Sequence, residues 1–278
     1  LRNMDIAKLK EKSISYREDT LKIITEANAG HTGGDLSCID ILNVLYNEIL
    51  NITPADINNP DRDRYIQSKG HSAEALYAVL AERGFMPREW TSKVCAYLSP
   101  AAGHPTRKIP GVEQNTGALG HGLPIGVGTA IAGKIDRRSY RVFVLLGDGE
   151  LAEGSNWEAS MAAANYKLDN LVVIVDRNGL QISGSTEDVM ALEPLSDKFK
   201  SFGYAVREVD GHDLAELISV FRAVPFEKGK PNLIIAHTIK GKGVSFMENQ
   251  AKWHHGVPSP DQMTEALREL DSERKSYA

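Results

Sequence analysis

The chain has 278 residues, 42% of them hydrophobic and 25% charged, which is typical of a globular domain with a substantial core. Its net charge is −5 and no basic block occurs, so binding to nucleic acid or to an anionic membrane is not expected. No apolar stretch approaches the roughly 20 residues that span a bilayer, and no signal peptide opens the chain. We therefore expect a cytoplasmic protein, with Cys38 and Cys95 as buried or partly buried free thiols in helical surroundings.

Helical spacing of apolar residues dominates the first half of the chain. It predicts three helices, over residues 5–28, 36–48 and 71–84. Gly30 ends the first helix, and residues 30–34 read as a flexible polar loop. Residues 51–64 contain two prolines and many Asp and Asn residues, which is typical of a surface connection. Residues 99–124 are rich in Gly and Pro, and a loop this long is usually functional or disordered; its embedded histidines favour function.

The second half alternates apolar runs with helical segments, the pattern of a parallel sheet. Strands are predicted at 142–146, 171–175, 204–209 and 233–237. Helices are expected at 122–135 and 213–223 and also between the first two strands, where Ser155 or Asn156 would be the N-cap. The charged tail after about residue 260 reads as a short, frayed helix. The sequence thus predicts one α/β domain over residues 1–278: a mostly parallel sheet with helices on both faces.

Polar residues follow two successive predicted strands. Asp148 lies in a Gly-Asp-Gly triplet after the first apolar run, and Asn178 follows the second run about thirty residues later. Strand, loop, helix and strand form a βαβ unit, so both residues should lie at the carboxyl edge of the sheet, where open α/β sheets bind ligands. Two hard oxygen ligands beside glycines, which let a diphosphate approach closely, suit Mg²⁺ or Ca²⁺.

The spacing Gly-Asp-Gly, about thirty residues, then Asn resembles the diphosphate-binding motif of thiamine diphosphate enzymes. Other stretches narrow the resemblance to transketolase, and they occur in that family's order over about residues 15–260. They are residues 29–34 (AGHTGG), 68–72 (SKGHS), 102–105 (AGHP), 116–122 (TGALGHG), 176–179 (DRNG) and 254–256 (HHG). Any one of these motifs alone is weak, but the ordered set is highly specific.

The resemblance implies a set of cofactor and metal contacts. Asp148 and Asn178 would bind the metal, with the Leu180 backbone carbonyl as a third ligand. Thiamine diphosphate would contact the following residues: His71, Gly117, Ala118, Leu119, Gly149, Glu153, Asn178 and Leu180. Glu153 would lie near a subunit interface, close to an activating glutamate of the partner domain.

Four histidines are expected to be catalytic on the same grounds. His31, His104 and His255 would contact the ketose oxygens, and His71 the cofactor or the intermediate. Histidine suits these roles because it exchanges protons with sugar hydroxyls near pH 7. His212 and His237, in contrast, read as structural residues.

Several positions depart from the common transketolase pattern or have no assigned role. His121 replaces a commoner glutamine, Thr32 replaces a usual proline, and Asp35 lies nearby. These changes leave the cofactor motif intact but could alter how the sugar is recognised. The basic stretch Lys240-Gly241-Lys242-Gly243 reads equally well as a solvated loop or as a loop over the channel mouth that binds substrate phosphate.

The chain is about half as long as a full transketolase, whose second domain grips the aminopyrimidine and supplies the activating glutamate. The resemblance is therefore to the N-terminal subunit of a split transketolase, completed by a separate pyrimidine-binding chain, most simply as an α₂β₂ assembly. Such an enzyme transfers a two-carbon glycolaldehyde unit from a ketose to an aldose phosphate. Whether the ketose is an ordinary pentose phosphate or a modified or sulfonated sugar is left open.

Three alternatives remain. The chain could belong to another thiamine diphosphate enzyme, such as a deoxyxylulose phosphate synthase or the α subunit of a 2-oxo acid dehydrogenase. Such an enzyme would share the metal motif but not the histidine series. A cofactor-binding subunit could be purely regulatory, although every matched histidine is present. A zinc hydrolase built from the glycine-flanked histidines would lack the usual His-Glu-x-x-His or Cys-pair spacing.

Overall fold

The computed structural model describes residues 5–277, in which a five-stranded parallel sheet forms the centre. The strand order across the sheet is β1-β2-β3-β7-β6. The strands are β1 (Arg64–Gln67), β2 (Val142–Gly147), β3 (Leu171–Arg177), β6 (Ala205–Asp210) and β7 (Asn232–His237). A separate two-residue hairpin, β4 (Leu180–Gln181) and β5 (Gly184–Ser185), follows β3. The predicted parallel α/β fold is confirmed.

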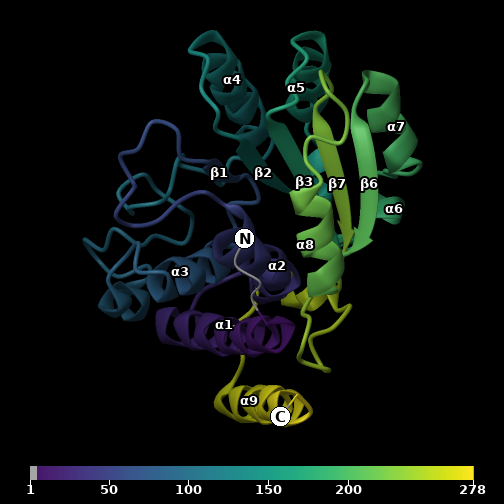
Figure 1. Ribbon diagram of the computed structural model, residues 1–278. Coiled ribbons are helices and arrows are strands. Elements are labelled where there is room, and N and C mark those ends of the chain that lie inside the picture. The colour runs from purple at the N-terminus through teal and green to yellow at the C-terminus, as the bar shows by residue number, and fades with distance from the viewer. Residues whose placement is uncertain (1–4, 278) are drawn as a thin grey trace.

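Helices cover both faces of the sheet (Figure 1). On one face lie α4 (Gly122–Ile135), α5 (Gly154–Asn165) and α7 (Leu195–Phe202). On the other face lie α1 (Ile6–Ala27), α2 (Thr32–Val44), α3 (Ala73–Glu82) and α8 (Leu214–Arg222). Shorter helical segments are η1 (Leu45–Ile49), η2 (Arg88–Lys93), η3 (Gly149–Ala152), α6 (Thr186–Val189) and η4 (Ala251–His254).

Alternation along the central strands divides the core into two clusters. Phe143 and Leu145 of β2 pack with α1, α2, α3 and α8, whereas Val142, Val144 and Leu146 pack with α4, α5 and α7. Successive side chains of a strand point to opposite faces, so a strand buried on both faces must be apolar throughout. This is why the runs at β2 and β3 are recognisable from the sequence.

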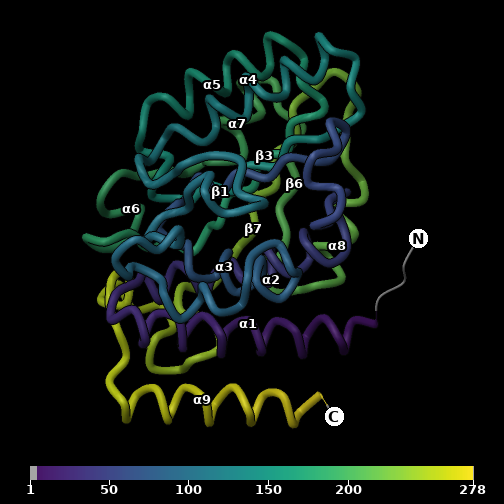
Figure 2. The backbone as a smooth tube through the Cα atoms, turned by 90° about the vertical axis from the view of Figure 1, so that its left-hand side faces the viewer, coloured from purple at the N-terminus to yellow at the C-terminus, as the bar shows by residue number. Residues whose placement is uncertain are grey.

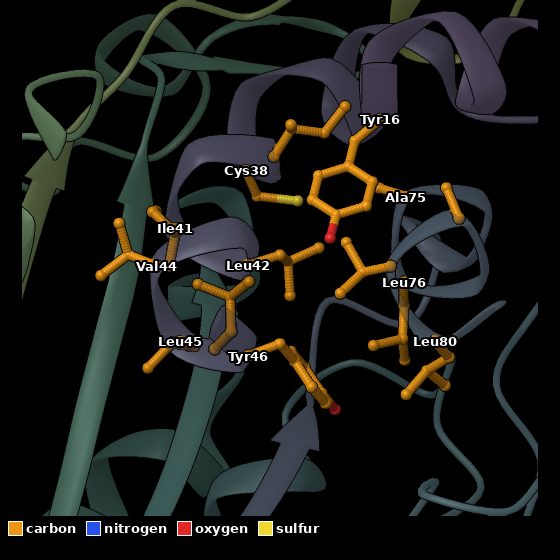
Figure 3. Packing of buried hydrophobic residues seen from close by; sticks show 14 of the residues in the cluster. Tyr16, Cys38, Ile41, Leu42, Val44, Leu45, Tyr46, Ala75, Leu76 and Leu80 are labelled. Carbon is orange, nitrogen blue, oxygen red and sulfur yellow. The ribbon is translucent and has the colours of Figure 1, made fainter. Parts of the chain in front are cut away.

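The packing of α2 against α3 fixes the part of the molecule that carries the histidines. Figure 3 shows Leu42 of α2 and Tyr46 just beyond it facing Leu76 and Leu80 of α3, with Tyr16 of α1 beside them. All thirteen residues of α2 are buried, which makes it the central helix of this face. Buried Leu and Ile side chains each contribute roughly 1.5–3 kcal/mol of transfer free energy.

The C-terminal segment forms a longer and better anchored helix than the predicted frayed tail. Helix α9 (Pro260–Lys275) begins with a capping box in which Ser259 and Gln262 bond each other's backbone. It runs beside α1 (Figure 2), with Ala266 and Leu270 buried in the core. The prediction failed because few apolar residues mark the buried stripe, and the cap does not depend on hydrophobicity.

Two other expectations about secondary structure were wrong, and strand β1 was not predicted. Residues 30–34 are not all loop, because α2 begins at Thr32. Helix α5 begins at Gly154 with Glu153 at the N-cap position, so neither Ser155 nor Asn156 caps it. Strand β1 was missed because only two of its four residues are apolar, and it is defined by pairing with β2.

The two cysteines differ in environment. Cys38 is buried in α2 as expected, but Cys95 is exposed. Cys95 has a φ of 61° and lies in a turn after η2 rather than in a helix. Within residues 5–277, no helix has the length and apolar character needed to cross a membrane.

Candidate active site

The carboxyl ends of three adjacent strands surround one cavity of about 130 Å³. Asp148 follows β2, Asn178 follows β3, and Lys240 follows β7. These residues line the cavity together with Leu119, Gly149 and other residues: Lys69, His71, Gly147, Glu150, Leu180, Gln181, Ile182 and His254. The chain passes through β1, β2, β3 and the edge strand β6 before it returns to β7, and the cavity lies at the carboxyl edge of the sheet, where open α/β sheets bind ligands.

Asp148 and Asn178 are held in place by neighbouring backbone groups. The Asp148 carboxylate accepts the N–H groups of Gly149 at 2.8 Å and Gly179 at 2.6 Å. Arg177 approaches it at 3.2 Å, while burial and nearby Asp176 raise the pKa of Asp148. The Asn178 side-chain oxygen accepts the Leu180 N–H at 3.1 Å. The structure thus brings the three predicted metal ligands together around a single cavity.

A buried ion pair lies directly beneath this edge. Lys69 and Asp176 are 1% and 0% exposed and bond each other. Asp176 also accepts hydrogen bonds from Ser37 of α2 at 2.6 Å and from Thr238 after β7. Burial acts to raise the pKa of Asp176, but Lys69 and these hydrogen bonds outweigh it and lower the pKa below its ordinary value. Sequence reasoning assigned neither member of the pair a role, although both fall inside matched motifs.

A second buried lysine faces the cavity. Lys240 is 1% exposed, and its ammonium donates to the Leu180 carbonyl at 3.3 Å and lies 3.1 Å from His254 Nδ1. Burial, together with the positive charge of Lys69, lowers the pKa of Lys240 to about 8. This first lysine of the Lys240–Gly243 stretch is therefore a cavity residue and not part of a solvated loop.

The four histidines predicted to be catalytic gather beside the cavity. The His31 ring is 4.8 Å from His255, 5.3 Å from His71 and 6.0 Å from His104, centroid to centroid. Thr32 Oγ1 donates to the Gly256 carbonyl at 2.5 Å, which holds the 254–256 segment against the start of α2. His254, to which the sequence assigns no role, stacks on His71 at 5.3 Å. The HHG motif is visible in the sequence, but nothing in it distinguishes its two histidines.

The histidine cluster is electrostatically unusual because it lies beside two buried ammonium groups. Burial and neighbouring His255, His104, Lys240 and Lys69 lower the pKa of His31 to about 4. Burial and Lys240 lower the pKa of His254 to about 3, and burial with Lys69 lowers that of His71. At neutral pH these rings are therefore uncharged, and each can accept a proton or a hydrogen bond.

A buried carboxylate holds the glycine-rich loop, residues 116–122, beside the cavity. Glu150 accepts the N–H groups of Gly120 at 2.9 Å and Gly147 at 3.1 Å, which ties the loop to the end of β2. Gly117 has a φ of 126°, and a Cβ there would lie 2.6 Å from the His104 ring, so only glycine fits. Leu119 lines the cavity, whereas Ala118 and Glu153 are exposed beside it.

The remaining histidines lie outside the cluster. His212 bonds Asp40 at 2.8 Å and accepts the Ile239 N–H, and exposed His237 pairs with Glu208, so both are structural as predicted. His121 is exposed, and its ring contacts the Ala118 and Leu119 carbonyls. No group of three or more His, Cys, Asp or Glu side chains within residues 5–277 has metal-site geometry, which leaves the zinc alternative without support.

We predict that the neutral histidines make the chain acid-sensitive. His31 keeps a folded pKa near 4 while an unfolded histidine has 6.5, so between these values the unfolded state binds more protons and stability falls as pH falls. Between about pH 7 and pH 5, His31→Asn should lose less stability than the wild type, by roughly 1 kcal/mol after solvent screening. Urea unfolding at both pH values measures this, with His237→Asn as the control. Equal losses in wild type and His31→Asn would contradict the assignment.

Comparison with known proteins agrees with this geometry. Residues 11–275 match the family model for the thiamine diphosphate-binding domain of transketolase. One relative, a subunit of the apulose-4-phosphate transketolase of Phocaeicola vulgatus, is 50% identical over 98% of this chain and 96% of its own length. A 6-deoxy-6-sulfo-D-fructose transketolase subunit from a Clostridium species is 37% identical over 95% and 97%.

Among solved structures, the transketolase of Campylobacter jejuni superposes with a TM-score of 0.87 at 29% identity, covering 99% of this chain and 48% of that one. This chain therefore has the length of the separate subunits and about half the length of that transketolase. The predicted family is confirmed, and the matches favour it over the other thiamine diphosphate enzymes. The chain belongs to the transketolase family, of which it is a thiamine diphosphate-binding domain.

Proposed function

We propose that this chain is the diphosphate-binding subunit of a two-chain transketolase that moves a two-carbon ketol unit from a ketose to an aldose phosphate. The observation that carries this proposal is the meeting of two chemistries at one cavity. Asp148, Asn178 and Leu180 offer oxygen atoms on one side, and a cluster of histidines, among them uncharged His31, lies on the other. The first suits a metal diphosphate, and the second suits sugar hydroxyls.

The three proposed metal ligands suit a hard divalent cation, which we propose to be Mg²⁺ or Ca²⁺. Its members are a carboxylate, an amide oxygen and a main-chain carbonyl, with no sulfur and no imidazole. Glycines 147 and 149 line the same cavity and leave room for a diphosphate to approach the backbone. Thiamine diphosphate, when bound, supplies the electron sink for cleaving the C–C bond of the ketose. We place its diphosphate against Gly117, Ala118, Leu119, Gly149 and Asn178, with Glu153 at the rim.

The histidines of this chain would orient the sugar and move its protons. His104 and His255 are exposed at the open side of the cluster, where a donor hydroxyl can reach them, and His31 lies between them. His31 Nδ1 is buried without a hydrogen-bond partner, so it is free to donate or accept a hydrogen bond. His71 lines the cavity itself, which supports the proposal that it contacts the cofactor rather than the sugar.

A partner chain is part of the proposal because this chain encloses only part of such a cofactor. The cavity of about 130 Å³ is smaller than the roughly 300 Å³ at which ligand pockets usually begin. Ile182 lines it but is 70% exposed, and Met190 nearby in sequence is 60% exposed. Apolar side chains exposed at the rim of a site are typical of an interface. We propose that a pyrimidine-binding subunit covers this rim in an α₂β₂ assembly.

The sugar we propose is a modified ketose phosphate, with apulose 4-phosphate first. The relative named for that sugar is 50% identical, against 37% for the relative named for 6-deoxy-6-sulfo-D-fructose. The similarity extends over nearly the whole length of each relative.

Removing a metal ligand should abolish metal-dependent cofactor binding. Asp148→Ala and Asn178→Ala each delete one oxygen ligand, and Mg²⁺ requires nearly ideal octahedral coordination. Titration calorimetry of the assembled enzyme should show a loss of thiamine diphosphate affinity of roughly 100-fold or more. Glu153→Gln, at the exposed rim, should retain much more affinity. Unchanged affinity in both alanine variants would place the metal site elsewhere.

Removing a sugar-facing histidine should affect turnover and not cofactor binding. His104→Asn and His255→Asn should lower kcat/KM for the donor by roughly 10²–10⁴-fold, the range of general acid–base contributions. Thiamine diphosphate affinity should stay nearly normal in both variants, and His237→Asn should match the wild type. Loss of cofactor affinity with a normal rate at saturating cofactor would reverse this division of roles.

The function itself is tested by reconstitution. The isolated chain with thiamine diphosphate, Mg²⁺, a ketose phosphate and an aldose phosphate should show no turnover, because the pyrimidine-binding half is missing. With a co-purified partner chain, a donor screen should give its highest kcat/KM for apulose 4-phosphate, above xylulose 5-phosphate and 6-deoxy-6-sulfo-D-fructose. Robust turnover by the isolated chain would refute the two-chain proposal, and preference for another donor would refute the substrate.

A further inference from the structure

Two carboxyl groups meet in the interior behind the histidine cluster. Asp35, in the first turn of α2, is 0% exposed, and Glu74, in the first turn of α3, is 1% exposed. Its position in the sequence suggests that Asp35 could contact the sugar. However, Asp35 is fully buried, and neither it nor Glu74 lines the cavity, so such a contact is not available. Two buried negative charges side by side would be costly, because each lacks water and repels the other.

Each carboxyl group has one buried oxygen without a conventional donor. If both groups were ionised, Asp35 Oδ2 and Glu74 Oε2 would each be buried without a hydrogen-bond donor. The side chains are nevertheless within hydrogen-bonding reach of each other. A proton between these two oxygens satisfies both at once, which is the arrangement of two carboxyl groups that share one proton.

The surroundings indicate which group keeps the proton. Asp35 Oδ1 accepts the Ala75 N–H at 2.8 Å at the N-terminus of α3, where Ser72 makes no capping hydrogen bond of its own. A negative charge is favoured there by the helix dipole and by the nearby Lys69 ammonium. Burial raises the pKa of both groups, that of Asp35 to about 7 and that of Glu74, where the charge of Asp35 is the next cause, to about 10. Glu74 is therefore the acid and Asp35 the carboxylate.

The pair joins the segments that carry three of the four histidines. His31 immediately precedes α2, and His71 lies three residues before Glu74. Tyr77, one turn beyond Glu74, donates its hydroxyl to the Ala102 carbonyl at 2.8 Å and to the His104 carbonyl at 3.1 Å. Titratable groups that face the pair from the surrounding elements are Cys38, Lys69, Tyr77 and Cys95.

We propose that Asp35 and Glu74 share one proton, and that this hydrogen bond is a positioning contact which fixes the spacing of His31, His71 and His104. The shared proton is a property of this chain alone, whereas its effect on catalysis rests on the proposed function. Glu74→Gln keeps a donor of the same shape at this position, and Glu74→Ala removes it. The two variants therefore separate the hydrogen bond, which Glu74→Gln keeps, from the titratable proton, which both variants remove.

Infrared difference spectroscopy of the purified chain tests the proton directly. At neutral pH, wild type minus Glu74→Gln should contain the carbonyl stretching band of a protonated carboxylic acid. The same band should be absent from wild type minus His237→Gln. No protonated-acid band in the first difference spectrum would overturn the proposal.

Stability against pH gives a second measurement on the same variants. Glu74 keeps its proton up to about pH 10 in the folded state but only to 4.5 in the unfolded state. Between these values the folded state binds the extra proton, so stability falls as pH rises. From about pH 6 to pH 9, the unfolding midpoint of the wild type should fall more steeply than that of Glu74→Gln. Parallel curves would overturn the proposal.

The positioning role is tested in the assembled enzyme. Glu74→Ala leaves Asp35 Oδ2 unsatisfied and should lower kcat/KM for the donor by roughly tenfold to hundredfold. Glu74→Gln should restore it to within about twofold of the wild type. Equal impairment of the two variants, or normal kinetics in Glu74→Ala, would overturn positioning. The infrared band and the pH slope could appear although neither the wild type nor any variant transfers a ketol unit. That result would refute the proposed function and leave the shared proton supported.

Discussion

The buried ion pair between Lys69 and Asp176 holds the carboxyl edge of the sheet together. Lys69 follows β1, Asp176 lies near the end of β3, Thr238 follows β7, and Ser37 belongs to α2, so one carboxylate joins four elements. Removing one member of such a pair costs roughly 3–5 kcal/mol, because the other charge is left buried and unpaired. Asn178 lies two residues beyond Asp176, and its orientation depends on this anchor.

The same lysine contributes to the electrostatics of the histidine cluster. Burial is the largest cause that lowers the pKa values of His31, His71 and His254, and the positive charges of Lys69 and Lys240 add to it. A cluster of histidines in water would be partly charged near pH 6.5 and would repel itself. Here the rings of His31, His71 and His254 lie within 5.7 Å of one another, centroid to centroid, because burial, aided by the two ammonium groups, keeps them neutral. Lys69 therefore contributes both to the structural anchor and to the chemical state of the site.

The sequence predicted those parts of the site whose signal is local. Asp148 and Asn178 follow strands that are apolar along nearly their whole length, so their placement at one edge could be inferred from the sequence alone. Lys69 could not be placed, because β1 is strand only through its pairing with β2. Lys240 was equally hidden, since a lysine beside glycine reads as solvated and fully buried lysines are rare. Asp35 was noticed, but its burial against Glu74 depends on how α2 packs on α3.

The buried polar contacts indicate which requirements of the site this chain meets and which its proposed partner must meet. The Lys69–Asp176 and Asp35–Glu74 pairs are buried behind the site, where they would hold the proposed metal ligands and the histidines in position before any ligand binds. The open side carries exposed His104, His255 and Ile182, which water reaches freely. Hydrogen bonds to a developing charge are stronger where water is excluded. This chain alone can therefore hold the reacting groups in position, but only a surface that covers Ile182 can give them the dry environment that transfer of a ketol unit requires.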